Sequence, residues 1–173
     1  MKIAITGKMC SGKSSIANLL VEGDNRFKIY SFGKKVKDVA KDLFDMKEKD
    51  RTLLVSIGTK MREINPDVWV NYVIKQTEKQ THCIVDDLRY QNEYEALSKA
   101  GFKIIQLKLD PQIQENRIKQ VYPNNFEDHL KNINHISEKN DFQWLEKDSP
   151  LIIDSGKETI FEIMNKINEY IRS

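Results

Sequence analysis

Glycine, lysine and serine residues near the amino terminus have a spacing that suits phosphate chemistry. Residues 7–14, GKMCSGKS, fit the pattern G-x-x-x-x-G-K-[ST] at every fixed position. In such a loop the backbone N–H groups surround a phosphate, the lysine reaches the β- and γ-phosphates, and the serine hydroxyl binds Mg²⁺. We therefore expect Lys13 to act in catalysis and Ser14 to bind the metal. The residues expected to form the cradle are Gly7, Lys8, Met9, Cys10, Ser11, Gly12, Lys13, Ser14 and Ser15.

Two carboxylates follow the apolar residues 83–85, which are predicted to form a strand. Asp86 and Asp87 would lie at the carboxyl end of that strand, where ligands bind in open α/β sheets, and either could hold Mg²⁺. The alternative is that they cap a helix, although two carboxylates exceed what one cap needs. Arg89 follows at the same edge and is a candidate for binding an anion.

Arginines are scarce in this chain and are therefore informative. Only six of the 28 basic residues are arginine, so lysine carries most of the surface charge. Arginine is favoured where a planar fork of N–H donors binds an anion. Arg117 lies on a predicted helix before a polar segment, where its charge could stabilise a transition state. Arg62 lies on the polar side of a predicted helix, and its spacing alone indicates an exposed charged residue.

The phosphate loop and the acidic pair need a sheet to position them, and the hydrophobic pattern predicts one. Short apolar runs alternate with segments whose apolar residues recur at helical spacing. This alternation predicts an α/β fold: one sheet of about five parallel strands, with helices on both faces in a three-layer sandwich. The expected strands are 2–6, 27–32, 83–85, 102–109 and 151–153, and the expected helices are 14–21, 34–44, 53–64, 65–79, 90–100, one beginning at 110–111, and 160–171.

A polar segment interrupts this pattern between about residues 121 and 149, and the insertion expected to form a lid spans about 117–149. It contains Pro123 followed by two asparagines, and its charges are scattered without periodicity. A polar insertion late in a chain of this size is typical of a lid that expels water from a phosphoryl-transfer site. No repeat or linker divides the rest, so residues 1–173 are expected to form a single domain that carries this insertion.

Composition and charge exclude several classes of protein. With 7 glycines, 4 prolines and 2 cysteines in 173 residues, the chain is neither collagen-like nor a disulfide scaffold, and the cysteines lack zinc-ligand spacing. The 28 basic and 26 acidic residues give a net charge of +2, which disfavours a nucleic-acid partner. No apolar run reaches the ~18 residues of a membrane span, so we expect a cytoplasmic protein without membrane contact. The oligomeric state stays open, with a homodimer as one alternative.

The rest of the sequence narrows the class of phosphate-loop protein. A GTPase would carry the guanine-reading string N-K-x-D, but the nearest match, residues 165–168 (NKIN), lacks the aspartate and lies within a predicted helix. The chain is also short for a motor or DNA-handling ATPase. We therefore expect a kinase that uses ATP and Mg²⁺ to phosphorylate a small molecule.

Short motifs along most of the chain occur in an order that points to one family. After the phosphate loop come Ser31-Phe32 followed by Lys37, IGT with Arg62, NPDVW at 65–69, DLRYQNE at 87–93, HISE at 135–138 and DSG at 154–156. In this order they resemble the motifs of the deoxynucleoside monophosphate kinases of bacteriophages and large DNA viruses. That family is related to other nucleoside monophosphate kinases and to animal-type phosphomevalonate kinase.

The resemblance implies a reaction and a set of residues for it. The reaction is transfer of a phosphoryl group from ATP to a deoxynucleoside monophosphate, with Mg²⁺ as cofactor. Asp87 would lie beside the transferred phosphate or its metal. The residues that would bind the acceptor phosphate are Lys37, Arg62 and Arg89.

Two further assignments implied by the resemblance have structural alternatives. Trp69 lines the acceptor pocket, or it packs in the core as a tryptophan on an amphipathic helix often does. Glu138 binds substrate by ordering the lid together with His135, or the two residues cap a short helix.

Two other functions remain as alternatives. The first is a phosphate-loop kinase for another small phosphorylated metabolite, such as phosphomevalonate or dephospho-coenzyme A. The second is a nucleotide-binding regulatory or nucleic-acid-associated ATPase, against which the near-zero net charge argues.

Overall fold

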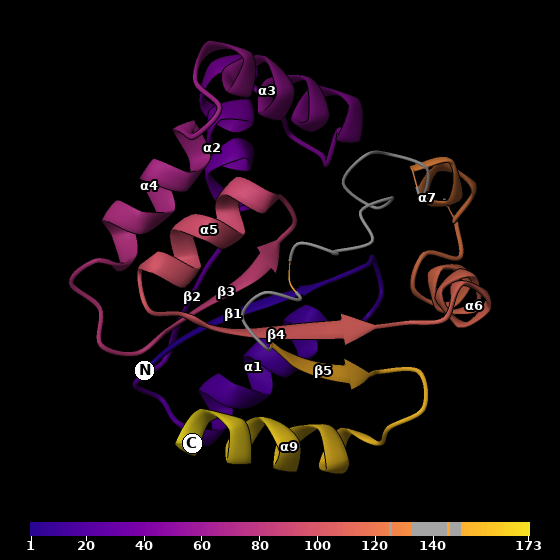
Figure 1. Cartoon of the computed structure of the whole chain (residues 1–173). Coiled ribbons are helices and arrows are strands. Elements are labelled where there is room, and N and C mark those ends of the chain that lie inside the picture. Colours follow the sequence, from indigo (N-terminus) through magenta and orange to yellow (C-terminus); the bar gives the residue numbers. More distant parts are fainter. Residues whose placement is uncertain (125, 133–144, 146–149) are drawn as a thin grey trace.

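A parallel sheet of five strands forms the centre of the molecule (Figure 1). The computed structural model describes residues 1–124, 126–132, 145 and 150–173. The strands lie in the order β2-β3-β1-β4-β5, and every neighbouring pair is parallel, which confirms the predicted α/β class. The strands are β1 (Lys2–Gly7), β2 (Lys28–Tyr30), β3 (Cys83–Leu88), β4 (Lys103–Lys108) and β5 (Leu151–Asp154).

Helices cover both faces of the sheet, as the alternating pattern predicts (Figure 1). Two of them lie on one side, α1 (Lys13–Gly23) and α9 (Ile160–Arg172). On the other side lie α2 (Phe32–Phe44), α3 (Arg51–Ile64), α4 (Val68–Thr77) and α5 (Gln91–Lys99). Beyond the carboxyl end of β4 lie α6 (Pro111–Val121) and α7 (Phe126–Asn132).

Alternating side chains of the strands supply two hydrophobic cores. In β1, Ile3 and Ile5 pack with apolar residues of α1 and α9, whereas Ala4 packs with those of α2, α4 and α5. All three side chains are 0% exposed. A parallel sheet covered on both faces has no solvated side, so its strands are apolar runs without polar alternation.

The connections between strands reverse direction next to β1. The chain passes from β1 to β2 toward one edge, and later from β3 across β1 to β4 on the other side. In open α/β sheets ligands bind where the strand order reverses in this way. The phosphate loop follows β1, and the acidic pair lies at the end of β3. Both strands are next to the reversal, so both features lie at the carboxyl edge.

Several boundaries differ from those predicted. β3 extends to Leu88, so Asp86 and Asp87 lie within the strand rather than after it. The helix expected over 65–79 begins at Val68, where the turn that contains Pro66 ends. The segment 117–149 begins inside α6 and contains α7, and the rest of it, apart from a few residues, lies outside the described part of the chain. Within the described residues, no helix combines the length and hydropathy needed to cross a membrane.

Candidate active site

The loop between β1 and α1 has the backbone that a phosphate cradle requires. Gly7 (φ 148°) and Gly12 (φ 95°) adopt φ values that L side chains rarely adopt. A Cβ at Gly7 would lie 2.6 Å from the carbonyl oxygen of Leu107 in β4, so glycine is required there. Gly12 is the N-cap of α1, and the N-terminus of a helix offers unpaired N–H groups and the positive end of its dipole to an anion.

Lys13 is folded back over this loop. Its ammonium donates hydrogen bonds to the carbonyl oxygens of Gly7 at 2.7 Å and Lys8 at 2.8 Å. The residue is only 9% exposed, so its charge is concentrated within the loop. A buried ammonium held by the loop that surrounds the phosphates can neutralise the charge of a nucleotide bound there.

Ser14 and Asp86 meet at the start of α1. The Ser14 hydroxyl donates to Asp86 Oδ2 at 3.0 Å, which brings together the end of β3 and the first turn of the helix. These two oxygen ligands fit Mg²⁺, which binds a few protein oxygens and completes its coordination with water and substrate phosphates. The described residues contain no cluster of three or more histidine, cysteine, aspartate or glutamate side chains that could hold a metal.

Asp87 has a different environment from its neighbour. Its carboxylate accepts hydrogen bonds from the backbone N–H groups of Phe32 at 2.9 Å and Gly33 at 2.8 Å, the first two residues of α2. Burial raises the pKa of Asp87, and the two N–H groups oppose that shift. Asp87 therefore does cap a helix, as one of the two interpretations of the acidic pair expects. The capped helix is α2, which precedes Asp87 in the chain, and not the helix that follows Asp87.

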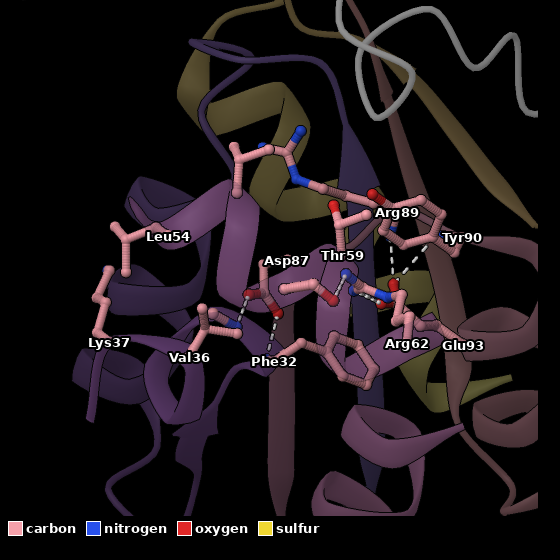
Figure 2. A pocket seen from close by; sticks show the side chains of 13 residues that line it. Phe32, Val36, Lys37, Leu54, Thr59, Arg62, Asp87, Arg89, Tyr90 and Glu93 are labelled. Atoms are coloured by element: carbon pink, nitrogen blue, oxygen red, sulfur yellow. Dashed lines mark hydrogen bonds and ion pairs between the residues drawn. The ribbon is translucent and has the colours of Figure 1, made fainter. Parts of the chain in front are cut away.

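A cavity of about 260 Å³ lies beside Asp87, at the carboxyl edge of the sheet (Figure 2). One part of its lining is apolar and comes from α2 and α3: Phe32, Val36, Leu54 and Val55. The cationic part comes from three different elements and comprises Lys37, Arg62 and Arg89. The structure therefore brings together the three residues that the resemblance assigns to an acceptor phosphate, next to an apolar wall.

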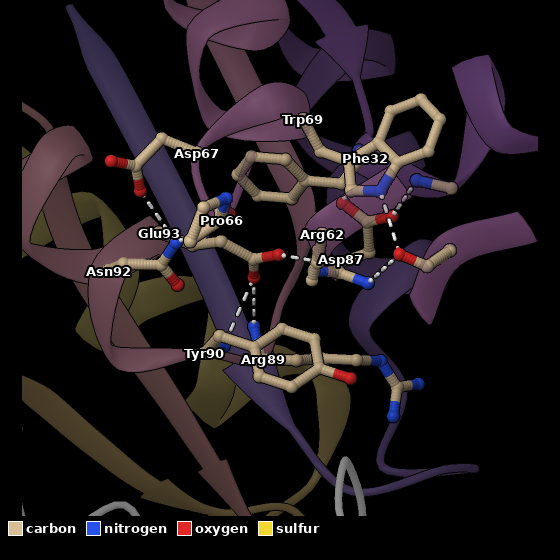
Figure 3. A network of polar contacts seen from close by, with 12 residues as sticks. Phe32, Arg62, Pro66, Asp67, Trp69, Asp87, Arg89, Tyr90, Asn92 and Glu93 are labelled. Carbon is tan, nitrogen blue, oxygen red and sulfur yellow. Dashed lines mark hydrogen bonds and ion pairs between the residues drawn. The ribbon is translucent and has the colours of Figure 1, made fainter. Parts of the chain in front are cut away.

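Arg62 is held by a network of contacts at one side of the cavity (Figure 3). Its Nη2 pairs with Glu93 Oε1 at 3.2 Å, and its Nη1 donates to the Gly58 carbonyl oxygen at 3.2 Å. Its guanidinium lies 4.4 Å from the centroid of the Tyr90 ring. These contacts restrict the guanidinium to one orientation at the cavity wall, which spacing along α3 alone does not reveal.

Glu93 links both arginines; in the sequence it is the last residue of the DLRYQNE motif, without a role of its own. Its Oε2 accepts from the backbone N–H groups of Arg89 at 2.9 Å and Tyr90 at 3.1 Å, while Oε1 pairs with Arg62. The side chain is 2% exposed, and burial raises the pKa of Glu93 to about 7 despite these partners. The available signal was its position three residues after Tyr90 at a helix start, which is the position of the acidic partner in a capping box.

Trp69 lies in the core, as the structural alternative for this residue predicts. It is 3% exposed, belongs to the cluster that packs under α2 and α5, and is absent from the cavity lining. Its indole N–H donates to the same Gly58 carbonyl oxygen as Arg62, at 3.2 Å. Trp69 therefore contacts Gly58, a residue that lines the cavity, from the core side. Glu138 and His135 lie outside the described residues.

Arg117 lies beside the phosphate loop. Its Nη1 donates to the Cys10 carbonyl oxygen at 3.3 Å and its Nη2 to the Ser155 carbonyl oxygen, in the turn after β5, at 2.6 Å. One turn earlier on α6, Gln114 donates from Nε2 to the Met9 carbonyl oxygen at 3.1 Å. The expected transition-state cation thus joins a carbonyl of the phosphate loop to a carbonyl of the turn after β5.

The fold and the loop together define a P-loop kinase fold, and the comparisons with solved structures agree. An uncharacterized protein from Eubacterium ventriosum superposes with a TM-score of 0.61 at 20% identity over 99% of this chain and 98% of that one. A shikimate kinase from Bacteroides thetaiotaomicron gives 0.60 at 13% identity over 99% and 97%. A gluconokinase from Sinorhizobium meliloti gives 0.57 at 13% identity over the same shares.

The family follows from the sequence match. The family model described as AAA domain matches residues 3–128, and the chain belongs to that family. The match includes the phosphate loop, the acidic pair and α6. No curated protein matches the sequence significantly.

Proposed function

We propose that this protein is an ATP-dependent kinase that transfers the γ-phosphoryl group of ATP to a deoxynucleoside monophosphate, giving ADP and the diphosphate. The observation that carries the proposal is the pairing of two sites at one edge of the sheet. A phosphate loop suited to the donor lies next to a separate cavity with a cationic group of side chains and an apolar wall. The order of motifs that resembles the deoxynucleoside monophosphate kinases supports this choice of acceptor.

The donor half of the site consists of the loop, Lys13 and the Ser14–Asp86 pair. The loop N–H groups and Lys13 would hold the phosphates of ATP. Ser14 and Asp86 would hold Mg²⁺, which when bound to ATP neutralises charge on its β- and γ-phosphates.

The acceptor half consists of the cavity beside Asp87. Arg62 and Arg89 would bind the phosphate of the acceptor through charge-assisted hydrogen bonds, with Lys37 adding a third positive charge. Phe32 and Val36 offer apolar surface on which a nucleobase can pack. A ligand that combines a phosphate with a flat apolar group suits both parts of this lining.

The hydrogen bonds that the cavity carboxylates already accept favour a phosphate acceptor over a hydroxyl acceptor. A kinase that phosphorylates a hydroxyl group commonly uses a side-chain base, such as an aspartate, to take its proton. The two acids that line the cavity, Asp87 and Glu93, already accept hydrogen bonds on all four of their carboxylate oxygens. A monophosphate acceptor is itself an anion and needs no base, so catalysis would consist of positioning and charge neutralisation.

A turnover assay with a panel of acceptors tests the proposal. ADP release from Mg·ATP is measured with each of the deoxy- and ribonucleoside monophosphates, with phosphomevalonate, with dephospho-coenzyme A, and with DNA or RNA. We expect at least one deoxynucleoside monophosphate to stimulate ADP release strongly and to appear as its diphosphate.

The other outcomes identify the rival functions. Stimulation by only phosphomevalonate or dephospho-coenzyme A would assign the chain to the kinases of other phosphorylated metabolites. Stimulation by only DNA or RNA, without a phosphorylated product, would assign it to the nucleic-acid-associated ATPases. Either result overturns the proposed acceptor while leaving the phosphate loop as the ATP site.

A further inference from the structure

Two side chains of α6 contact backbone carbonyl groups of the phosphate loop. Gln114 Nε2 donates to the carbonyl oxygen of Met9 at 3.1 Å, and Arg117 Nη1 donates to the carbonyl oxygen of Cys10 at 3.3 Å. The two residues are three positions apart and so share one face of the helix. They therefore hold two consecutive peptide groups of the loop from the same side.

Fixing these carbonyl groups also fixes N–H groups. In a planar trans peptide the C=O of one residue and the N–H of the next point in opposite directions. When Met9 C=O is held toward α6, the N–H of Cys10 is directed away from α6. Holding Cys10 C=O likewise fixes the N–H of Ser11, which donates to the Lys8 carbonyl oxygen at 3.2 Å and so closes a turn within the loop. Backbone N–H groups of such a loop are the groups that bind phosphate oxygens.

The loop needs this support because its backbone is strained. Cys10 has φ 60°, a left-handed value that is unfavourable for a residue with a Cβ. Strained backbone persists when the surrounding contacts determine it, and α6 supplies such contacts.

Burial shows that the Gln114 contact is part of the fold. Gln114 is 1% exposed, and a buried amide must find a hydrogen-bond partner inside the protein. Glutamine is otherwise an unusual choice for a buried position on a helix that packs against a loop. The Met9 carbonyl oxygen accounts for it, although the two residues are 105 positions apart in the chain.

We propose that Gln114 and Arg117 are positioning residues for the donor triphosphate: by holding the Met9 and Cys10 carbonyl groups, they keep the loop N–H groups directed at the phosphates. The inference rests on the proposed function, in which ATP occupies this loop. It assigns Arg117 a role in binding the ground state, in addition to or in place of the transition-state role expected from the sequence.

The first test compares Gln114→Met with Gln112→Met by calorimetric titration with Mg·ADP. Methionine keeps the length and volume of glutamine but cannot donate, and Gln112 is exposed on the same helix. We expect the Kd for Mg·ADP to rise about tenfold in Gln114→Met, as for the loss of one buried hydrogen bond, and to stay within about twofold in Gln112→Met. The KM for ATP should rise in parallel, while the KM for the acceptor should not change, which loss of general stability would not produce.

The second test uses Arg117→Met and separates positioning from transition-state stabilisation. ADP lacks the transferable phosphoryl group, so a purely transition-state cation would leave the Kd for Mg·ADP unchanged while kcat falls. The positioning role predicts a Kd for Mg·ADP that rises severalfold or more. This variant also keeps the inference testable if Gln114→Met does not fold.

The outcomes distinguish this inference from the proposed function. If the unmodified protein binds neither Mg·ATP nor Mg·ADP, the proposed function fails. If the unmodified protein binds both, and folded Gln114→Met and Arg117→Met bind Mg·ADP with unchanged Kd, the positioning role is wrong and the proposed function stands.

Discussion

At the scale of single residues, Lys13 is the side chain on which the donor site depends most. Its ammonium already lies within the loop, held by two carbonyl oxygens, so it needs no large movement to meet a phosphate. In the proposed reaction its charge would stabilise the transferring phosphoryl group more than the ground state. Lys13→Ala should therefore lower kcat by on the order of 10²-fold or more while the protein stays folded.

Steady-state kinetics together with circular dichroism checks this prediction. Lys75→Ala, at an exposed position on α4, is the matched control and should behave as the unmodified protein. A folded Lys13→Ala with near-normal turnover would contradict the assignment of the phosphate loop.

The two cavity arginines give a second prediction at this scale. Arg62→Lys and Arg89→Lys keep the positive charge but lose the planar fork, and Arg62→Lys also loses the stacking on Tyr90. We expect the acceptor KM to rise by roughly tenfold or more for each substitution, a loss of at least ~1.4 kcal/mol. The KM for ATP should change little, because in the proposed function the donor phosphates bind the separate loop.

Varying each substrate in turn measures the two KM values. Arg172→Lys, at the exposed carboxyl end of α9 and far from the cavity, is the control. If both cavity variants weaken ATP and leave the acceptor unaffected, these arginines belong to the donor site.

At the scale of elements, the start of α5 depends on a buried carboxylate. Glu93 accepts from the backbone N–H groups of Arg89 and Tyr90 and pairs with Arg62 of α3, so one side chain joins the helix start to a neighbouring helix. Burial raises its pKa from 4.5 to about 7. The folded protein therefore keeps a proton on Glu93 over a pH range in which the unfolded chain has lost it.

Because the pKa of Glu93 differs between the folded and unfolded states, the free energy of unfolding depends on pH. A raised folded-state pKa contributes stability that is complete below about pH 4.5 and is lost as the pH rises to about 7. Over that range the contribution of Glu93 to the free energy of unfolding should fall by about 3 kcal/mol. Glu93→Gln cannot titrate, so its stability relative to the unmodified protein should increase from pH 5 to pH 7.5.

Urea denaturation at a series of pH values measures this difference. Glu95→Gln, exposed on the same helix, serves as the control. A constant difference between Glu93→Gln and the unmodified protein across the range would show that the buried carboxylate does not take up a proton there.

At the scale of the whole molecule, the hydrophobic cores and the candidate binding site occupy different parts of the structure. The two clusters of apolar side chains hold the sheet and its helices, whereas the phosphate loop, Asp87 and the α6 contacts lie together at the carboxyl edge. A ligand that binds there stabilises only the folded state. At a concentration of 100 times its Kd it adds about 2.7 kcal/mol to the free energy of unfolding.

Thermal unfolding should therefore report binding to this edge. For a chain of this length we expect Mg·ATP at that concentration to raise Tm by about 5–10 °C. The same addition should raise Tm much less in Lys13→Ala. An equal increase in both proteins would place the nucleotide elsewhere on the molecule.

The sequence by itself determined the phosphate loop, the α/β class and the edge of the sheet that carries the site. The physical reason is that these features depend on neighbouring residues. The glycines, Lys13 and Ser14 lie within eight consecutive positions. The alternation of strands and helices follows from the local periodicity of hydrophobic residues. The carboxyl edge then follows from parallel strand order, because every strand ends on the same side.

Only the tertiary structure decided which partner each polar side chain finds. Asp87 caps a helix that begins 55 positions earlier, Glu93 pairs with a residue 31 positions away, and Gln114 supports a loop 105 positions away. Local spacing shows which residues share a face of one element, but it does not specify which other element packs against that face. For that reason Glu93 stood in the sequence only as the last residue of the DLRYQNE motif, and nothing in the sequence pointed to Gln114. Packing alone places Trp69 in the core next to the residues that line the cavity.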